Sequence, residues 1–364
     1  MEKYKPLGRS DRSMPGELAK DCVVIGDPTE ASQIYNKGFY GYPMSGGGLQ
    51  LEFLEALFLV EASRLEVLSG EKPVPLHKLM AMAASDNRDF EIKYIVYRDL
   101  RQRGYVVKTA GEDFDFRVFP RGGSPTTTQT KNWVAARSER ALFDMSSFVE
   151  DIDRAERTRK ELLLAVVDEE GDLTYYSADR AEPKGRLEDP GSGEEVEARL
   201  LEDRVLVFDE AGAQRLYGSG YYGKQLGKVL QLSLIEAAYL MEEGRLRVST
   251  LATSRNVPLP RFKKRALKFQ PDFELRLSAY RDLRSRGMVV KTGFKYGTHF
   301  RVYEDDPDKI HARFLVHCIP EDHTTTWPEM SRAVRLAHGV KKEILFAWVR
   351  PQGTEYLRLA RVRP

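Results

Sequence analysis

The sequence YRDLRSRGMVVKT, which begins at Tyr280, repeats the sequence YRDLRQRGYVVKT, which begins at Tyr97. Four further blocks recur in the same order at nearly the same offset. Upstream, YNKGFYG at Tyr35 matches YGSGYYG at Tyr217, and LQLEFLEALFL at Leu49 matches LQLSLIEAAYL at Leu230. Downstream, FRVF at Phe116 matches FRVY at Phe300, and KELLLAVV at Lys160 matches KEILFAWV at Lys342. Self-similarity at one fixed period indicates a duplicated unit. The chain is therefore an internal duplication, and each copy serves as a control for the other.

The period of the duplication is too long for a solenoid, so each copy is expected to fold as a unit. The segment AEPKGRLEDPGSGEE, which begins at Ala181, is rich in Pro, Gly and acid and indicates a linker. We expect an N-terminal repeat (copy one), a linker and a C-terminal repeat (copy two) over 1–185, 186–195 and 196–364. Each copy is expected to divide again, into 1–85 and 86–185 and into 196–268 and 269–364.

Hydrophobic periodicity predicts a mixture of helices and strands. In copy two, a strand VLVF at Val205 precedes an amphipathic helix LQLSLIEAAYLMEEG at Leu230. A helix through YRDLRSRG, stopped at Gly287, leads into strands MVVKTGF, HFRVYE and RFLVHCIP, then a helix EMSRAVRLAHGV and a strand EILFAWV. The fold class is α+β or α/β. Each repeat is expected to have a small N-terminal α/β subdomain and a C-terminal subdomain with a central mixed sheet flanked by helices.

Composition excludes several classes of protein. The 364 residues are 41% hydrophobic and 31% charged, which is typical of a globular protein. No apolar run approaches the roughly 20 residues of a membrane helix, and the start MEKYKPLGRSDRS has no apolar signal-peptide centre. Cys22 and Cys318 lie too far apart for a metal-type spacing. We expect a cytoplasmic protein without a membrane partner, a disulfide or a cofactor.

Charge is unevenly distributed along copy two. From Arg245 to Arg301 there are fifteen Lys or Arg residues against three acids. A basic block of this size favours a polyanion such as nucleic acid. A solvated helical face gives the same pattern, so charge alone leaves both interpretations open.

The two copies differ in the number and position of their histidines. Five of the six histidines fall in one stretch of copy two, and the equivalent stretch of copy one has none: His299, His311, His317, His323 and His338. Imidazole is the side chain best suited to moving protons near neutral pH. Because copy one folds without these histidines, they indicate chemistry that is confined to copy two.

Two further positions support an acid–base site. Tyr303 stands where copy one has Phe119, and His311 falls opposite Thr130. Lys342 has a counterpart in Lys160. Singly, a strand tyrosine, a surface histidine and a helix-end lysine are ordinary structural residues, and only the joint pattern favours catalysis. A metal site is not indicated, because His311, His317 and His323 have no ordered Cys or acidic partners.

These residues resemble the archaeal tRNA-splicing endonucleases in their tandem-duplicated, homodimeric form. The resemblance covers nearly the whole chain and is strongest in YRDLRSRGMVVKTGFKYGTHFRVYE, HARFLVHCIPED and RAVRLAHGVKKEILFAWV. It implies a nuclease-like C-terminal subdomain and a catalytic triad of Tyr303, His311 and Lys342. It also implies that copy one is a catalytically inactive structural copy.

The resemblance further implies cleavage of precursor tRNA at bulge–helix–bulge junctions without a metal ion. The ribose 2′-OH attacks the adjacent phosphate and leaves a 2′,3′-cyclic phosphate and a 5′-OH end. Tyr303 would take the 2′-OH proton, with Lys342 favouring its phenolate because a free tyrosine has a pKa of about 10. His311 would protonate the leaving oxygen, and Lys342 would neutralise charge on the phosphorane.

In the family, two arginines clamp a bulged base, and an acidic loop docks into the partner protomer. Arg335 matches the first arginine, and Arg361 or Arg358 matches the second. Glu321 and Asp322 match the acidic loop, which implies a homodimer. The chain departs from the family pattern at two positions. His299 replaces the acid before the FRVY-type strand and is a second candidate for the proton donor, and Gly339 replaces a small hydroxyl residue.

Two other classes of function fit the sequence less well. A metal-dependent nuclease or resolvase would need a carboxylate pair and a lysine at one site, which the strands around Val290 and Phe300 do not supply. A non-catalytic RNA-binding or assembly subunit would have no need of Tyr303, His311 and Lys342 together.

Overall fold

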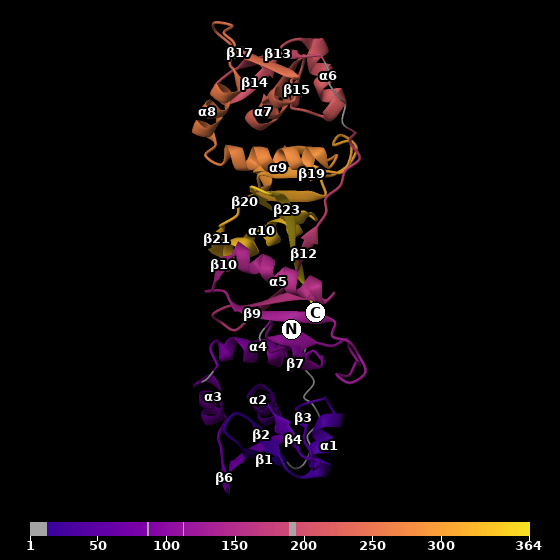
Figure 1. Cartoon of the computed structure of the whole chain (residues 1–364), viewed down its shortest axis with the longest axis vertical. Helices are drawn as coiled ribbons and strands as arrows, with labels where there is room; N and C mark the ends of the chain where they lie inside the picture. Colours follow the sequence, from indigo (N-terminus) through magenta and orange to yellow (C-terminus); the bar gives the residue numbers. More distant parts are fainter. Residues whose placement is uncertain (1–12, 86, 112, 189–193) are drawn as a thin grey trace. The chain divides into compact units, whose positions relative to one another are not determined.

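The computed structural model describes residues 13–85, 87–111, 113–188 and 194–364 (Figure 1). The chain forms two compact units. The first holds the chain up to Ala141, Asp153–Tyr176 and Val362–Pro364, and the second holds Leu142–Ile152 and Ser177–Arg361. Each unit thus contains most of one copy. The linker expected at 186–195 lies partly outside the described residues.

The first unit opens with a sheet in the order β3-β4-β2-β1-β5-β6. Its strands are β1 (Met14–Leu18), β2 (Val23–Ile25), β3 (Tyr42–Pro43), β4 (Leu49–Leu51), β5 (Leu65–Ser69) and β6 (Lys72–Pro73). Three helices accompany it: α1 (Pro28–Asn36), α2 (Phe53–Glu61) and α3 (Leu76–Ser85). β1 pairs antiparallel with β2 and parallel with β5, so this sheet is mixed.

The remainder of the first unit has strands in the order β7-β8-β9-β11 beside α4. Their bounds are α4 (Phe90–Gln102), β7 (Val107–Thr109), β8 (Phe116–Val118), β9 (Asn132–Ser138) and β11 (Glu161–Val167). β9 and β11 are parallel, whereas the other pairs are antiparallel. α5 (Met145–Arg157) and β12 (Leu173–Ala181) each cross the boundary between the units.

The second unit repeats the opening sheet in the order β15-β16-β14-β13-β17. The strands are β13 (Val196–Leu200), β14 (Arg204–Val207), β15 (Lys224–Leu226), β16 (Val229–Ser233) and β17 (Leu246–Thr250). The helices are α6 (Glu210–Gly220), α7 (Leu234–Glu242) and α8 (Leu259–Phe269).

A second mixed sheet, in the order β18-β19-β20-β22-β23, carries the candidate site. Its strands are β18 (Val289–Thr292), β19 (Phe300–Tyr303), β20 (Phe314–Pro320), β22 (Glu343–Arg350) and β23 (Gly353–Val362). The other elements are α9 (Phe273–Ser285), a 3₁₀ turn η1 (Phe294–Tyr296), α10 (Trp327–Gly339), and β21 (Thr324–Thr326) paired with β10 (Leu142–Asp144). α9 packs along this sheet, as Figure 1 shows.

The mixed helix-and-strand fold predicted from the sequence is confirmed, although one helix was expected to begin too early. Leu230 lies in β16, and the helix expected there begins only at Leu234. The Ser233 hydroxyl accepts a hydrogen bond from the Glu236 amide, and the Glu236 carboxylate accepts one from the Ser233 amide. This capping box fixes the helix start, because it satisfies amides that have no partner inside the helix.

A hydrophobic core in each unit holds these layers together. In the second unit one buried cluster runs from Val196 to Tyr356 and joins both sheets to α7 and α9. The first unit has the corresponding cluster, from Val23 to Tyr175. Among the described residues, no helix is both long and apolar enough to cross a membrane.

Candidate functional site

Tyr303 stands at the end of β19, where it faces Val289 of β18 in an antiparallel pair. Its side chain belongs to a small buried cluster with Val289 and Ala312, against which Leu187 and Tyr221 also pack. Only 7% of Tyr303 is exposed. The phenol is therefore anchored by packing, which holds its hydroxyl at one defined place.

Lys342 contacts the same cluster through the backbone of Ala312. It follows α10, and Lys341 turns the chain with a φ of 54° before β22 begins at Glu343. The Lys342 Nζ donates a hydrogen bond to the Ala312 carbonyl over 2.7 Å. His311, the residue before Ala312, is exposed. The structure thus brings the backbone of His311, the buried ring of Tyr303 and the ammonium of Lys342 together around Ala312.

The cation beside Tyr303 is Arg301, whose guanidinium carbon lies 5.8 Å from the Tyr303 ring centre. Burial raises the pKa of Tyr303, the Arg301 charge lowers it, and the shift is upward on balance. The phenol therefore keeps its proton at neutral pH in the free protein. The sequence suggested Lys342 for this role. The Lys342 ammonium donates to the Ala312 carbonyl, and Arg301 is the cation whose charge lowers the pKa of Tyr303.

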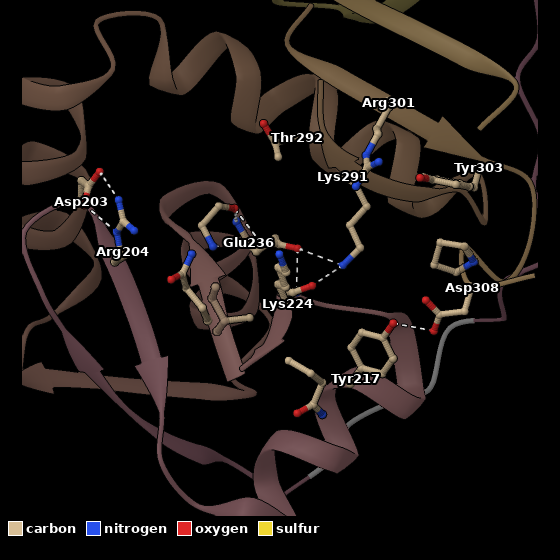
Figure 2. Close-up of a pocket in the computed structure, with 16 residues that line it drawn as sticks. Asp203, Arg204, Tyr217, Lys224, Glu236, Lys291, Thr292, Arg301, Tyr303 and Asp308 are labelled. Atoms are coloured by element: carbon tan, nitrogen blue, oxygen red, sulfur yellow. Dashed lines mark hydrogen bonds and ion pairs between the residues drawn. The ribbon is translucent and has the colours of Figure 1, made fainter. Parts of the chain in front are cut away.

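A cavity of about 650 Å³ opens beside this residue, between the two sheets of the second unit. Figure 2 shows Tyr303, Arg301 and Lys291 on one wall, with Glu236 and Asp308 nearby. Lys291 donates to the Gly223 carbonyl over 2.5 Å and lies 3.8 Å from a Glu236 oxygen. Burial lowers the pKa of Lys291, and the Glu236 charge opposes that shift.

The lysine–glutamate pair is present in both copies. In copy one, Lys108 donates to Glu55 over 2.7 Å and to the Gly41 carbonyl over 2.6 Å. A feature shared by the two copies cannot explain chemistry that belongs to one of them. We therefore assign the Lys291–Glu236 contact to the scaffold, as a tie between the second sheet and α7.

The candidate base-clamping arginines differ in their surroundings. The Arg358 guanidinium is held by Asp179, over 2.5 and 3.0 Å, and by Glu343, over 2.9 Å. Arg335 and Arg361 are exposed or nearly so, and neither makes an ion pair among the described residues. Arg361 lines a cavity of about 220 Å³ together with Lys342, His338 and Arg358.

His299 has a role that the sequence did not reveal. Its Nδ1 accepts a hydrogen bond from the Cys318 amide over 2.8 Å, and its Nε2 lies 3.4 Å from an Asp272 oxygen. In copy one, the Asp115 carboxylate accepts the equivalent bond from the Ala136 amide over 2.8 Å. The ring thus substitutes for an acid that joins neighbouring strands, and both of its nitrogens have polar neighbours.

The acidic pair lies on the loop from β20 to β21. Glu321 and Asp322 are both exposed, and their carboxylates form no ion pair within the described ranges. The Glu321 carbonyl accepts a hydrogen bond from the Trp348 indole over 3.2 Å, which fixes the start of the loop. The loop therefore presents two unneutralised carboxylates to the solvent.

Comparison with known proteins places this site in a family. The family model for the tRNA intron endonuclease catalytic C-terminal domain matches residues 90–175 and 273–356. The model for the N-terminal domain of the same family matches 14–80 and 196–256. The chain belongs to the tRNA intron endonuclease family. The family predicted from the sequence is therefore confirmed, and with it a tRNA-splicing endonuclease of archaeal type.

Individual relatives of this family match over their full length. The tRNA-splicing endonuclease of Methanococcoides burtonii is 40% identical over 96% of this chain and 100% of its own. That of Methanosarcina mazei is 39% identical over 95% and 98% of the two chains. The Haloferax volcanii protein is 33% identical over 96% and 100%. The duplication is therefore part of an architecture that these endonucleases share along their whole length.

Within this family member, the described residues contain no group of three or more His, Cys, Asp or Glu side chains placed to hold a metal ion. His299 and His317 do lie side by side, with ring centres 5.4 Å apart. Their polar neighbours, however, are a backbone amide, Asp272 and His323. These half-buried histidines thus make contacts within the protein and do not form a metal site among the described residues.

Proposed function

We propose that this endonuclease cleaves precursor tRNA at bulge–helix–bulge intron–exon junctions without a metal ion. The ribose 2′-oxygen forms a bond to the adjacent phosphorus while the bond from phosphorus to the 5′-oxygen breaks. The products are a 2′,3′-cyclic phosphate and a 5′-OH end. The convergence of Tyr303 and Lys342 on Ala312, next to His311, is the observation that supports this proposal most strongly.

In this mechanism Tyr303 accepts the 2′-OH proton. Because burial raises its pKa, only a small fraction is phenolate at neutral pH, and Arg301 favours that fraction. His311 donates a proton to the leaving 5′-oxygen, since an exposed imidazole can carry and release one. The Lys342 ammonium stabilises the negative charge that develops on the phosphorane oxygens.

Substrate binding in this proposal uses the remaining residues. Arg335 and Arg361 clamp a bulged base between their guanidinium planes, a contact to which single-stranded bases are well suited. Arg358 is occupied by Asp179 and Glu343, which favours Arg361 as the second arginine. The carboxylates of Glu321 and Asp322 dock onto a second copy of the chain, so the active form is a homodimer.

Variants of the triad and its counterparts in copy one test the proposal. Tyr303→Phe, which recreates Phe119, and Lys342→Ala should each lower the single-turnover cleavage rate about 10²- to 10⁴-fold. Lys160→Ala, the matched control, should leave it near normal, because Lys160 lies in copy one, where its ammonium donates to Gln129. Equal losses at Lys160 and Lys342 would contradict a site confined to copy two.

A modified substrate isolates the role of His311. With sulfur in place of the 5′-oxygen at the scissile bond, the leaving thiolate needs no proton. His311→Ala should therefore cleave the sulfur substrate at nearly the normal rate while failing on the oxygen substrate. Tyr303→Phe should fail on both. A His311→Ala variant that sulfur does not rescue would assign the proton donor elsewhere.

A further inference from the structure

Phe294 is the large hydrophobic side chain with the greatest exposure among the described residues, at 87%. It lies at the tip of the hairpin that connects β18 to β19, as the first residue of η1. A single exposed apolar residue is common and needs no explanation by itself. The surroundings of Phe294 distinguish it from an ordinary surface residue.

The backbone at the hairpin tip is ordered by its own hydrogen bonds. The Tyr296 amide donates to the Gly293 carbonyl over 2.8 Å, and the Gly297 amide donates to the Phe294 carbonyl over 3.0 Å. Gly297 has a φ of 66°, a left-handed conformation that glycine adopts without strain. The buried Thr298 hydroxyl donates to the Phe300 carbonyl over 3.1 Å. The ring is therefore held out in solvent by a defined turn.

The tip is adjacent to the proposed catalytic residues. The Lys342 Nζ lies 5.9 Å from the Tyr296 ring centre, and Tyr296 is close enough to Tyr303 to raise its pKa. A Cβ atom at Gly297 would stand 3.8 Å from Leu336, the neighbour of Arg335 on α10. An RNA strand bound at the triad would therefore pass this hairpin.

Cations without acidic partners lie on this hairpin and at the nearby end of α10. Among the described residues, four cations on this hairpin and at the end of α10 form no ion pair: Lys295, Arg335, Lys341 and Lys342. An exposed ring among free cations is the combination by which proteins hold single-stranded nucleic acid, since the ring stacks on a base and the cations neutralise phosphates.

Copy one has a different sequence at the same hairpin. Its tip reads AGEDFDF, with acids in place of the FKYG of copy two. Phe114, the aromatic residue nearest this tip, precedes the counterpart of His299 and therefore corresponds to the buried Thr298, not to Phe294. Because copy one forms its hairpin without an aromatic residue at the position of Phe294, the fold does not require a ring there.

We propose that Phe294 stacks on an unpaired nucleobase of the RNA, next to the nucleotide whose phosphate is cleaved. The inference rests on the proposed function and adds a base-binding residue to it. The four free cations favour RNA over a protein partner as the occupant, because they complement phosphates. Phe294 thus contributes to binding and positioning and takes no part in proton transfer.

Binding to an uncleavable RNA tests the proposal independently of catalysis. The probe is a bulge–helix–bulge RNA with 2′-deoxyribose at the cleavage site and 2-aminopurine at successive bulge positions, bound to the full-length protein. Phe294→Ala should weaken binding about 5- to 150-fold, the contribution of one stacked base. It should also abolish fluorescence quenching at one bulge position. Phe294→Trp should retain both.

Two controls separate stacking from other roles. Phe294→Leu keeps an apolar side chain but has no ring to stack, so it should bind the RNA as weakly as Phe294→Ala does. Phe208→Ala removes a different exposed ring, that of Phe208 (52% exposed), and should bind the RNA normally. The proposal is overturned if Phe294→Ala binds and quenches as the wild type does, if leucine substitutes fully, or if Phe294→Ala converts a dimer to monomers. If the wild-type protein quenches the 2-aminopurine fluorescence but does not cleave the all-ribose RNA, the stacking proposal is supported. The proposed function is then contradicted.

Discussion

At the residue scale, two half-buried imidazoles, those of His299 and His317, couple the stability of the second unit to pH. Burial, aided by the charge of Arg276 and by His317, lowers the pKa of His299 to about 4. Burial, aided by His323 and Arg276, lowers that of His317 to about 4. The Nδ1 of His299 must stay unprotonated to accept the Cys318 amide. Both rings are therefore neutral in the folded protein near pH 7.

This arrangement predicts that acid destabilises the fold. The folded-state pKa values lie below the ordinary value near 6.5, so below that pH the unfolded chain binds protons that the folded chain does not. Stability is complete above that pH and is lost as the pH falls toward 4. Between pH 7 and pH 5 each histidine should cost roughly 2 kcal/mol. Urea denaturation of wild type and His299→Asn measures this, and the same pH dependence in both would contradict it.

The residues that sequence reasoning found are those in which the copies differ. Tyr303 was recognisable because copy one has Phe119, and the five histidines of copy two because the equivalent stretch of copy one has none. Arg301 was missed because Arg117 occupies the same position in copy one, so comparing the copies gave no signal there. The burial that raises the pKa of Tyr303 depends on packing by Leu187 and Tyr221, which are distant in sequence.

At the element scale, periodicity located most helices and strands but not their ends. Leu230 was assigned to a helix because β16 and α7 are both apolar and adjoin without a gap. The capping box at Ser233 and Glu236 was the signal that could have separated them. The last strand, β23, was not predicted, because its residues GTEYLRLARV alternate only weakly between apolar and polar.

The loop from β20 to β21 is the segment that we expect to join two copies of the chain. Its two exposed carboxylates form no ion pair among the described residues of this chain, which leaves them open to cations of a second copy. Replacing both Glu321 and Asp322 by alanine should convert the proposed dimer to monomers, as measured by light scattering, and should leave little cleavage activity. Glu139→Ala, in the RSER segment of copy one, is the control and should stay dimeric. A double variant that still forms dimers would show that this loop does not join the subunits.

At the scale of the whole molecule, duplication separates structure from chemistry. Both copies keep the lysine–glutamate tie between sheet and helix, through Lys108 and Lys291. Only copy two has the tyrosine hydroxyl, the histidines and an exposed aromatic hairpin. The duplication and the fold class could be predicted from the sequence. The division of the chain into compact units could not, because residues 142–152 of copy one belong to the second unit.

The central claim is that side chains of copy two cleave RNA by attack of the ribose 2′-OH, with no metal ion. The most direct test is to incubate the wild-type protein with a bulge–helix–bulge precursor tRNA in excess EDTA and to identify the ends of the products. We predict undiminished cleavage and fragments that carry 2′,3′-cyclic phosphate and 5′-OH ends. Loss of cleavage in EDTA, or fragments with 3′-OH and 5′-phosphate ends, would contradict the account.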